Sequence, residues 1–272
     1  MHRPAERVVL TLATAIALAA CVSGCAPRAG EGSNEGADHD AISATVQPVF
    51  GVHPLVVVHA QRRFDRGASA KLGIDRLVAA FRAKERPVAF LTTDPGDSGW
   101  YTAERKPNAA LTSAGGEHRI GLTTNQVTIV GGFFSTQESA FGCHLAAVKN
   151  MVLNYFEGRP RVGPLTIHIP LDAVYFYEED AFLRRKLLDP TVPRVDVRQA
   201  LIDYTFFYRD AIDGIAPTHF ADPFPDGEVS LDRYSFQMSI DGEPLGAPVG
   251  HGERHVNLAL WRSVSAYAAK VQ

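Results

Sequence analysis

The sequence predicts an α/β domain, a three-layer sandwich on a mostly parallel, mixed β-sheet with a C-terminal β-rich extension. Short apolar runs such as 55–59 (LVVVH) lack polar alternation, which is typical of parallel strands buried on both faces. These runs alternate with segments whose apolar residues recur at helical spacing. A further run (VTIV) breaks at Gly131 and Gly132 and leads into a helical pattern, the arrangement from which open α/β sheets build ligand sites.

Length and composition favour one main folded domain that does not bind nucleic acid. The 272 residues are 46% hydrophobic and 21% charged, which suits a single globular core. A net charge of -3 and an isoelectric point near 6.4 provide no basic face for nucleic acid. We therefore expect no nucleic-acid partner, and we expect no cofactor.

The N-terminus has the pattern of a signal peptide. A basic start is followed by the apolar run 8–20, which is too short to span a bilayer as a helix. The run ends LAAC and resembles the lipobox of bacterial lipoproteins, which implies cleavage after residue 20 and acylation of Cys21, as with palmitate. Cys25, in the second match VSGC, is the alternative lipidation site. A plain secretory peptide, with two free or paired cysteines, remains the other interpretation.

The lipoprotein resemblance implies a location and a set of partners. Val22 rather than aspartate follows Cys21, which in Gram-negative lipoproteins implies the outer membrane, facing the periplasm. The expected partners are the membrane, through the N-terminal lipid, and a small-molecule ligand or an envelope protein. Residues 1–20 are the signal peptide, 21–47 a flexible polar tether and 48–272 one α/β domain, with 232–272 as a possible appended β-unit.

The first half of the folded part contains a strand–helix–strand unit. Strand 55–59, helix 68–86 and strand 87–92 predict a right-handed βαβ crossover with two parallel, neighbouring strands. Segments 118–122 and 126–130 flank a short polar turn, and this pattern predicts a hairpin.

The second half begins with the helix that follows the paired glycines and stops at Gly158. Pro170 indicates that the next strand, 164–174, bends, ends or lies at a sheet edge. The remaining expected elements are helices 178–188 and 197–208, an irregular loop 217–226, and strands 234–240 and 255–261 around a Gly/Pro-rich connection.

Four stretches in this order resemble the isochorismatase-like cysteine hydrolases: LVVVHAQRRFDRG, RAKERPVAFL, IVGGFFSTQES and TIHIPLDAV, within residues 55–174. The resemblance implies a parallel α/β sheet in which the first strand ends in an aspartate and a helix after a strand–glycine turn supplies the nucleophilic cysteine. This chain has His59 in place of that aspartate, and Gln137 or Glu138 in place of that cysteine. The segment expected to carry the family's lysine is shortened to 123–125. No catalytic residue of the family can be carried over.

Polar residues follow the predicted strands where such sheets bind ligands. His59 with Asp94 and Asp97 could form an acid–base set, because the ends of adjacent parallel strands lie close together. The alternative is a structural histidine beside aspartates that cap turns. Phe133 and Phe134 are expected to line the same rim. The candidate ligand-binding residues are His59, Trp100, Tyr101, Gly131, Gly132, Ser135, Thr136 and Gln137.

Cys143 is expected about two turns into the helix after the glycines. Adjacent helical residues point about 100° apart, so Cys143 and His144 cannot share a proton as a nucleophile and its base must. The apolar neighbours of Cys143 favour packing of this residue in the core, and a reactive thiol is the alternative.

His251, Glu253 and His255 could hold a metal, because residues at i, i+2 and i+4 share one face of an extended strand. A polar hairpin tip is the alternative.

These patterns lead to three functional hypotheses. The first is a lipid-anchored envelope protein that binds a small ligand or an envelope partner at the strand-end crevice. The second is an isochorismatase-like hydrolase with a rebuilt or metal-assisted site. The third is a structural envelope component whose crevice is filled by side chains.

Overall fold

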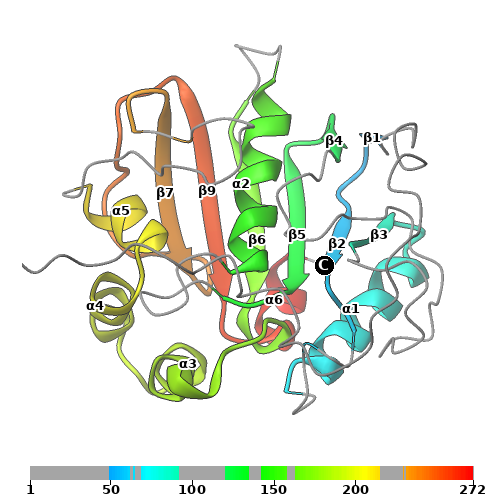
Figure 1. Cartoon of the computed structure of the whole chain (residues 1–272). Helices are drawn as coiled ribbons and strands as arrows, with labels where there is room; N and C mark the ends of the chain where they lie inside the picture. The colour runs from blue at the N-terminus through cyan, green and yellow to red at the C-terminus, as the bar shows by residue number, and fades with distance from the viewer. Residues whose placement is uncertain are drawn as a thin grey trace, which may run out of the picture.

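The computed structural model describes residues 49–61, 64, 69–91, 120–134, 142–157, 163–214, 229 and 231–271. Its main sheet has seven strands in the order β3-β2-β5-β6-β9-β7-β8, and a second sheet joins β1 and β4 (Figure 1). Every neighbouring pair in the main sheet is parallel except β7 with β8. The predicted mostly parallel, mixed sheet is confirmed.

The strands are β1 (Val49–Phe50), β2 (Leu55–Val58), β3 (Val88–Leu91), β4 (Gly121–Leu122), β5 (Gln126–Gly131), β6 (Leu165–Pro170), β7 (Tyr234–Ile240), β8 (Glu243–Pro244) and β9 (Arg254–Trp261). The helices are α1 (Lys71–Ala83), α2 (Cys143–Phe156), α3 (Ala181–Leu188), α4 (Arg194–Tyr204), α5 (Phe207–Asp213) and α6 (Val264–Val271).

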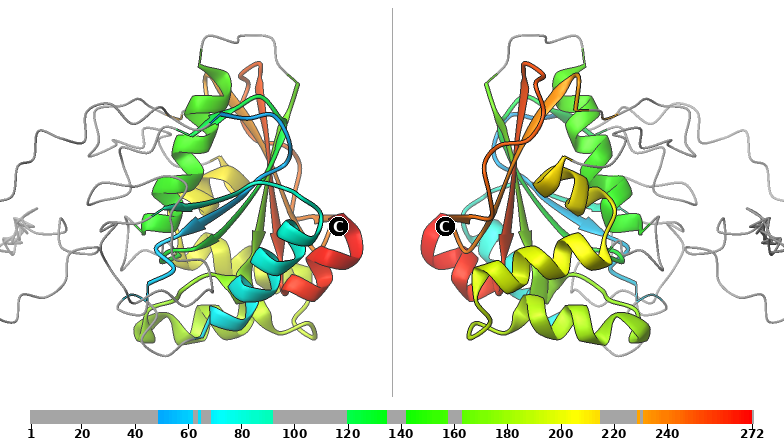
Figure 2. Two further views of the ribbon diagram at one scale, coloured as in Figure 1. Left: turned by 90° about the vertical axis from the view of Figure 1, so that its right-hand side faces the viewer. Right: turned by 90° about the vertical axis from the view of Figure 1, so that its left-hand side faces the viewer.

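Helices cover both faces of the sheet and complete the predicted sandwich (Figure 2). One apolar core gathers residues of α2, α3, α4 and α5 against the sheet, and the other gathers residues of α1 and α6. Alternate residues of one strand divide between the two faces, as Val56 and Val58 join the first core while Leu55 and Val57 join the second. All four are fully buried, which explains their continuous apolar run.

The predicted βαβ unit is confirmed, since β2 and β3 are parallel neighbours with Leu55 opposite Val88. The predicted hairpin is wrong. Strand β4 pairs in parallel with β1, placing Gly121 opposite Val49, and Thr123 N–H then donates to the Phe50 carbonyl. Strand β5 has no edge left for β4, because β2 and β6 occupy both of its sides.

The middle of the chain differs from expectation in one element. The predicted helix 197–208 is two helices, α4 and α5, separated at Thr205. The Thr205 hydroxyl donates to the Leu201 carbonyl and accepts from the Arg209 backbone N–H, so one side chain closes α4 and begins α5. Pro170 is the last residue of β6, an interior strand, which confirms that it ends the strand.

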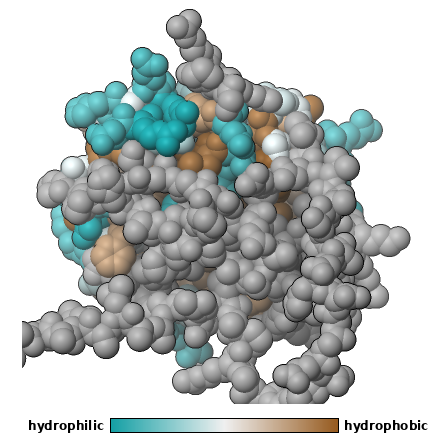
Figure 3. All heavy atoms as spheres, turned by 45° about the horizontal axis from the view of Figure 1, so that its top comes forward, coloured by the Kyte–Doolittle hydropathy of each residue, from teal (hydrophilic) through white to brown (hydrophobic). Residues whose placement is uncertain are grey.

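The C-terminal strands continue the main sheet. Strand β9 inserts between β6 and β7 and is parallel to both, so β7, β8 and β9 share the sheet of the rest of the domain and do not form an appended unit. The chain leaves β7 at Asp241 and Gly242, whose φ angles of +52° and +86° form the tight turn into β8. The return to β9 needs no crossover helix. Figure 3 brings the edge where the parallel strands begin toward the viewer, and hydrophilic residues are interspersed there with smaller hydrophobic areas.

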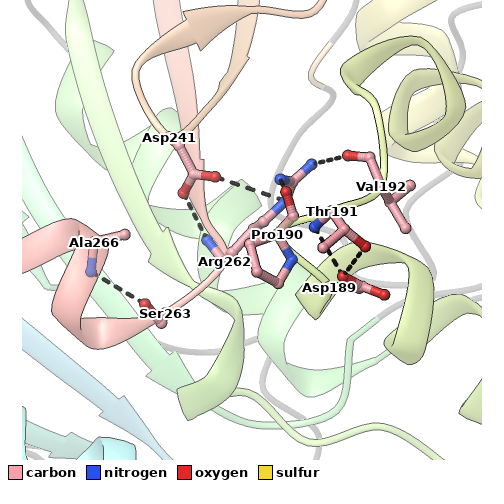
Figure 4. Close-up of polar contacts among 8 residues, drawn as sticks. All are labelled: Asp189, Pro190, Thr191, Val192, Asp241, Arg262, Ser263 and Ala266. Carbon is pink, nitrogen blue, oxygen red and sulfur yellow. Dashed lines mark hydrogen bonds and ion pairs between the residues drawn. The ribbon is translucent and has the colours of Figure 1, made fainter.

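Arg262 fastens the segment between α3 and α4 to the end of β9 (Figure 4). Its guanidinium donates to the carbonyl oxygens of Pro190 at 3.1 Å and Val192 at 2.7 Å. The same guanidinium lies 3.6 Å from one carboxylate oxygen of Asp241, and the backbone N–H of Arg262 donates to the other at 3.0 Å. A planar guanidinium can serve several acceptors at once, so this residue joins three segments of the chain.

Candidate functional site

The turn after β5 is a place where β2, β5 and α2 approach closely. Gly131 and Gly132 both adopt left-handed conformations, with φ of +68° and +66°. A Cβ on Gly131 would lie 2.2 Å from the Val58 carbonyl oxygen, and one on Gly132 would lie 2.8 Å from the His144 backbone nitrogen. Both positions require glycine, because any side chain would collide with a neighbouring backbone.

Cys143 is the first residue of α2, which corrects the expectation that it lies two turns into the helix. The chain stays extended after the glycines because Phe133 forms a parallel bridge with Tyr175 and Phe134 N–H donates to the Tyr175 carbonyl. Gly142, with φ of −64° and ψ of 137°, is extended too, and the helix begins later than its sequence pattern indicates. The backbone N–H of Phe133 donates to Cys143 Sγ at 3.1 Å, so the thiol lies against the strand-end turn. Cys143 is fully buried, as the core-packing interpretation expects.

His144 lies behind this turn and is fully buried. Its Nδ1 lies 2.8 Å from the Gly131 carbonyl oxygen, and this nitrogen must donate because a carbonyl only accepts. Burial lowers the pKa of His144 to about 4, and the hydrogen bond to Gly131 offsets part of that shift. His144 is therefore neutral at neutral pH, and it holds the glycine turn against the start of α2.

His59 directly follows β2 and lies beside the glycine turn, since Val58 pairs with Gly131. It is fully buried and has a positive φ of 50°, which is uncommon for a residue other than glycine. Its carbonyl accepts from the Tyr175 hydroxyl at 3.0 Å, and its ring stacks on Phe64 with the centroids 4.8 Å apart. These contacts hold the backbone of His59 in its left-handed conformation.

The two phenylalanines after the glycines have different environments. Phe133 is partly exposed and stacks on Tyr177, with ring centroids 4.1 Å apart, as expected of a residue at a rim. Phe134 is fully buried and stacks on Tyr208, with centroids 4.7 Å apart, so its predicted place at the rim is wrong. The two side chains leave an extended segment on opposite sides, and only one can face outward.

The structure thus brings together His59, Gly131, Gly132, Phe133 and Cys143, which we call the strand-end site. Tyr175 and Tyr177 were not predicted at this site, although three aromatic residues (YFY) after a parallel strand were the available signal. The remaining predicted residues fall outside the described part of the chain: Cys21, Cys25, Asp94, Asp97, Trp100, Tyr101, Ser135, Thr136 and Gln137.

The structure does not bring His251, Glu253 and His255 together on one strand face. Only His255 belongs to a strand, because β9 begins at Arg254, and all three residues are exposed. The chain is turned before β9 by Gly250, whose φ is +95°. Among the residues that the structure describes, no group of three or more His, Cys, Asp or Glu side chains is placed to hold a metal ion.

Comparison with known proteins adds no family to these observations. No protein-family model matches the chain, and no curated protein or solved structure matches it. Within the described ranges, no helix combines the length and apolar character needed to cross a membrane.

Proposed function

We propose that this chain is a lipid-anchored protein of the bacterial envelope, facing the periplasm from the outer membrane, which binds a small acid or amide at the strand-end site. The observation that carries the proposal is the left-handed backbone at two neighbouring strand ends, His59 and the Gly131–Gly132 turn, beside the first residue of α2. Open α/β sheets bind ligands outside the carboxyl ends of their strands, and a helix N-terminus favours an anionic or polar group.

Packing at this edge also supports a binding role. The strand ends are held by contacts between backbones, so the site is organised before a ligand arrives, which lowers the entropic cost of binding. Phe133, stacked on Tyr177 and partly exposed, adds an aromatic surface of the kind that lines small-molecule sites.

Cys21 carries the lipid in this proposal. Bacteria that express the full chain and are fed labelled palmitate should label the wild type and the Cys25→Ser variant, while Cys21→Ser should lose the label. Undiminished labelling of Cys21→Ser would assign the lipid to Cys25. Absence of label from the wild type would contradict the anchor.

Binding at the strand-end site is tested by thermal-shift measurements on the full chain carrying Cys21→Ser and Cys25→Ser. We expect benzoate, acetate or benzamide to raise the melting temperature by a few degrees, since ligand at 100 times its Kd stabilises a protein by about 2.7 kcal/mol. Phe133→Ala should abolish the shift. The matched control is Phe182→Ala, which removes an exposed aromatic residue on α3, and this variant should keep the full shift. Shifts that survive Phe133→Ala would place the site elsewhere.

The alternative is a hydrolase with a rebuilt site, and the position of Cys143 favours it. Its thiol lies at the start of α2 and accepts a hydrogen bond from Phe133 N–H. Helix N-termini and N–H donors stabilise thiolates in general. His144 is not placed to act as its base, because side chains of adjacent helical residues point about 100° apart. Hydrolysis of p-nitrophenyl acetate that Cys143→Ser abolishes would replace the binding proposal with this one.

A further inference from the structure

A polar network lies on the opposite face of the sheet, beneath α1 and α6. His53 Nε2 lies 2.8 Å from Thr128 Oγ1, and the same hydroxyl lies 2.8 Å from the phenolic oxygen of Tyr267. His168, opposite Thr128 on β6, accepts a hydrogen bond at Nδ1 from Trp261 Nε1 at 3.3 Å. The two imidazole rings stack with their centroids 5.4 Å apart. We call these five residues the histidine network.

We propose that the histidine network is an acid-sensitive latch, which holds the C-terminal helix α6 on the sheet near neutral pH and releases it on acidification. Helix α6 has eight residues, too few to be stable alone in water. Tyr267 is its fully buried anchor, since its hydroxyl binds Thr128 and its ring packs edge-on against His168 and Trp261. Helix α6 therefore depends on the network for its position.

The hydrogen bond between Trp261 and His168 exists only when His168 is neutral. An indole N–H can only donate, so Nδ1 of His168 must accept and the ring hydrogen must reside on Nε2. His168 is 6% exposed, and its Nε2 has no hydrogen-bond partner among the described residues. Protonation would place a hydrogen on Nδ1, and this new N–H would point at the indole N–H of Trp261. Two hydrogen-bond donors would then face each other. The added proton must break this contact.

His53 resists protonation for related reasons. Its pKa is lowered to about 3, first by burial and then by the neighbouring charges of His168 and Arg86. Burial lowers the pKa of His168 to about 4. Both groups have an ordinary pKa of 6.5, so a state in which α6 has opened binds protons more tightly than the closed state. Acidification from pH 6.5 toward pH 4 therefore favours opening.

One carboxyl group at the start of α6 acts in the opposite direction. Asp172 accepts from the Val264 backbone N–H at 2.8 Å, and burial raises its pKa although Arg76 and Arg184 lower it. A raised carboxyl pKa favours the folded state as the pH falls. The histidines dominate the first part of the descent, because there are two of them and they begin to titrate at pH 6.5.

Hydrogen exchange of the full chain, followed by mass spectrometry and corrected for intrinsic rates, tests the latch. Between pH 7 and pH 5 we expect amides of α6 to exchange at least about tenfold faster, and at both pH values to exchange faster than those of β5 and α2, because α6 opens locally while β5 and α2 open only when the domain unfolds. The variant His53→Gln, His168→Asn should lose this response, because the amides keep acceptors and donors near the same positions and do not titrate. The control is His251→Gln, His255→Gln, which removes two exposed histidines and should leave the response intact.

Trp261 provides a second readout that does not depend on the folding of the double variant. The chain has two tryptophans, so Trp100→Phe leaves Trp261 alone. Its fluorescence emission should shift with a midpoint below pH 6, in step with exchange of α6. A wild type whose α6 exchanges equally at both pH values would overturn the proposal, as would a tenfold acceleration of α6 exchange at pH 5 that persists in the double variant.

Discussion

Replacement of Gly131 by alanine is expected to lower the free energy of unfolding by at least about 3 kcal/mol. The residue has a φ of +68°, where an L side chain is strained by about 1–2 kcal/mol. Its Cβ would also lie 2.2 Å from the carbonyl oxygen of Val58, its register partner. Strand β2 cannot move aside without losing pairing to β3 or β5. Urea unfolding followed by circular dichroism measures the loss.

Gly163→Ala is the matched control for this substitution. Gly163 directly precedes the β6 region, and a Cβ there would meet nothing within 4 Å. We expect its free energy of unfolding to stay within about 0.5 kcal/mol of the wild type. A loss below about 1 kcal/mol for Gly131→Ala would contradict the close packing of β2 and β5 on which the strand-end site depends.

The sequence could predict those elements whose burial or backbone conformation determines their own residue types. Strand β2 is buried on both faces, and the sequence shows this directly as the unbroken run LVVV. The crossover from β2 through α1 to β3 follows from handedness and short connections alone. The Gly131–Gly132 turn was visible for the same reason, since only glycine tolerates both the φ angle and the contact distances.

The pairing of strands that are far apart in the sequence was harder to predict, because a strand can pair only along an edge that no other strand occupies. The sequence pattern predicts that β4 pairs with β5. However, β2 and β6 occupy both edges of β5, so β4 pairs with β1 instead. The insertion of β9 between β6 and β7 joins segments about 90 residues apart, which no local pattern specifies. Cys143 was misplaced because α2 begins at that residue, after Gly142 in an extended conformation with φ of −64° and ψ of 137°.

The histidine network was missed because its members lie on different elements that are far apart in the sequence. In β6 (LTIHIP), Leu165, Ile167 and Ile169 face one core, which turns His168 toward the other face. The period-two alternation was therefore the available signal for His168. Its connection to His53 and Tyr267 appears only when the sheet order is known.

His144 is expected to make the stability of the whole domain depend on pH. The pKa of its ring is about 4 in the folded protein and 6.5 when unperturbed. The unfolded chain therefore binds a proton first as the pH falls, so His144 reduces stability progressively from pH 6.5 to about 4 and not above that range. At about 1.4 kcal/mol per pH unit, the loss from this one fully buried group approaches about 3 kcal/mol.

His144→Asn isolates this contribution from those of His53 and His168, which act in the same direction. The asparagine amide nitrogen can occupy the place of Nδ1 and donate to the Gly131 carbonyl, but it does not titrate. Urea unfolding measured from pH 7 to pH 4 should show that the free energy of unfolding falls less steeply with pH in the variant. Near pH 5 the difference between the two slopes should correspond to the uptake of nearly one proton on unfolding. Equal slopes in both proteins would show that burial does not hold His144 neutral in the folded protein.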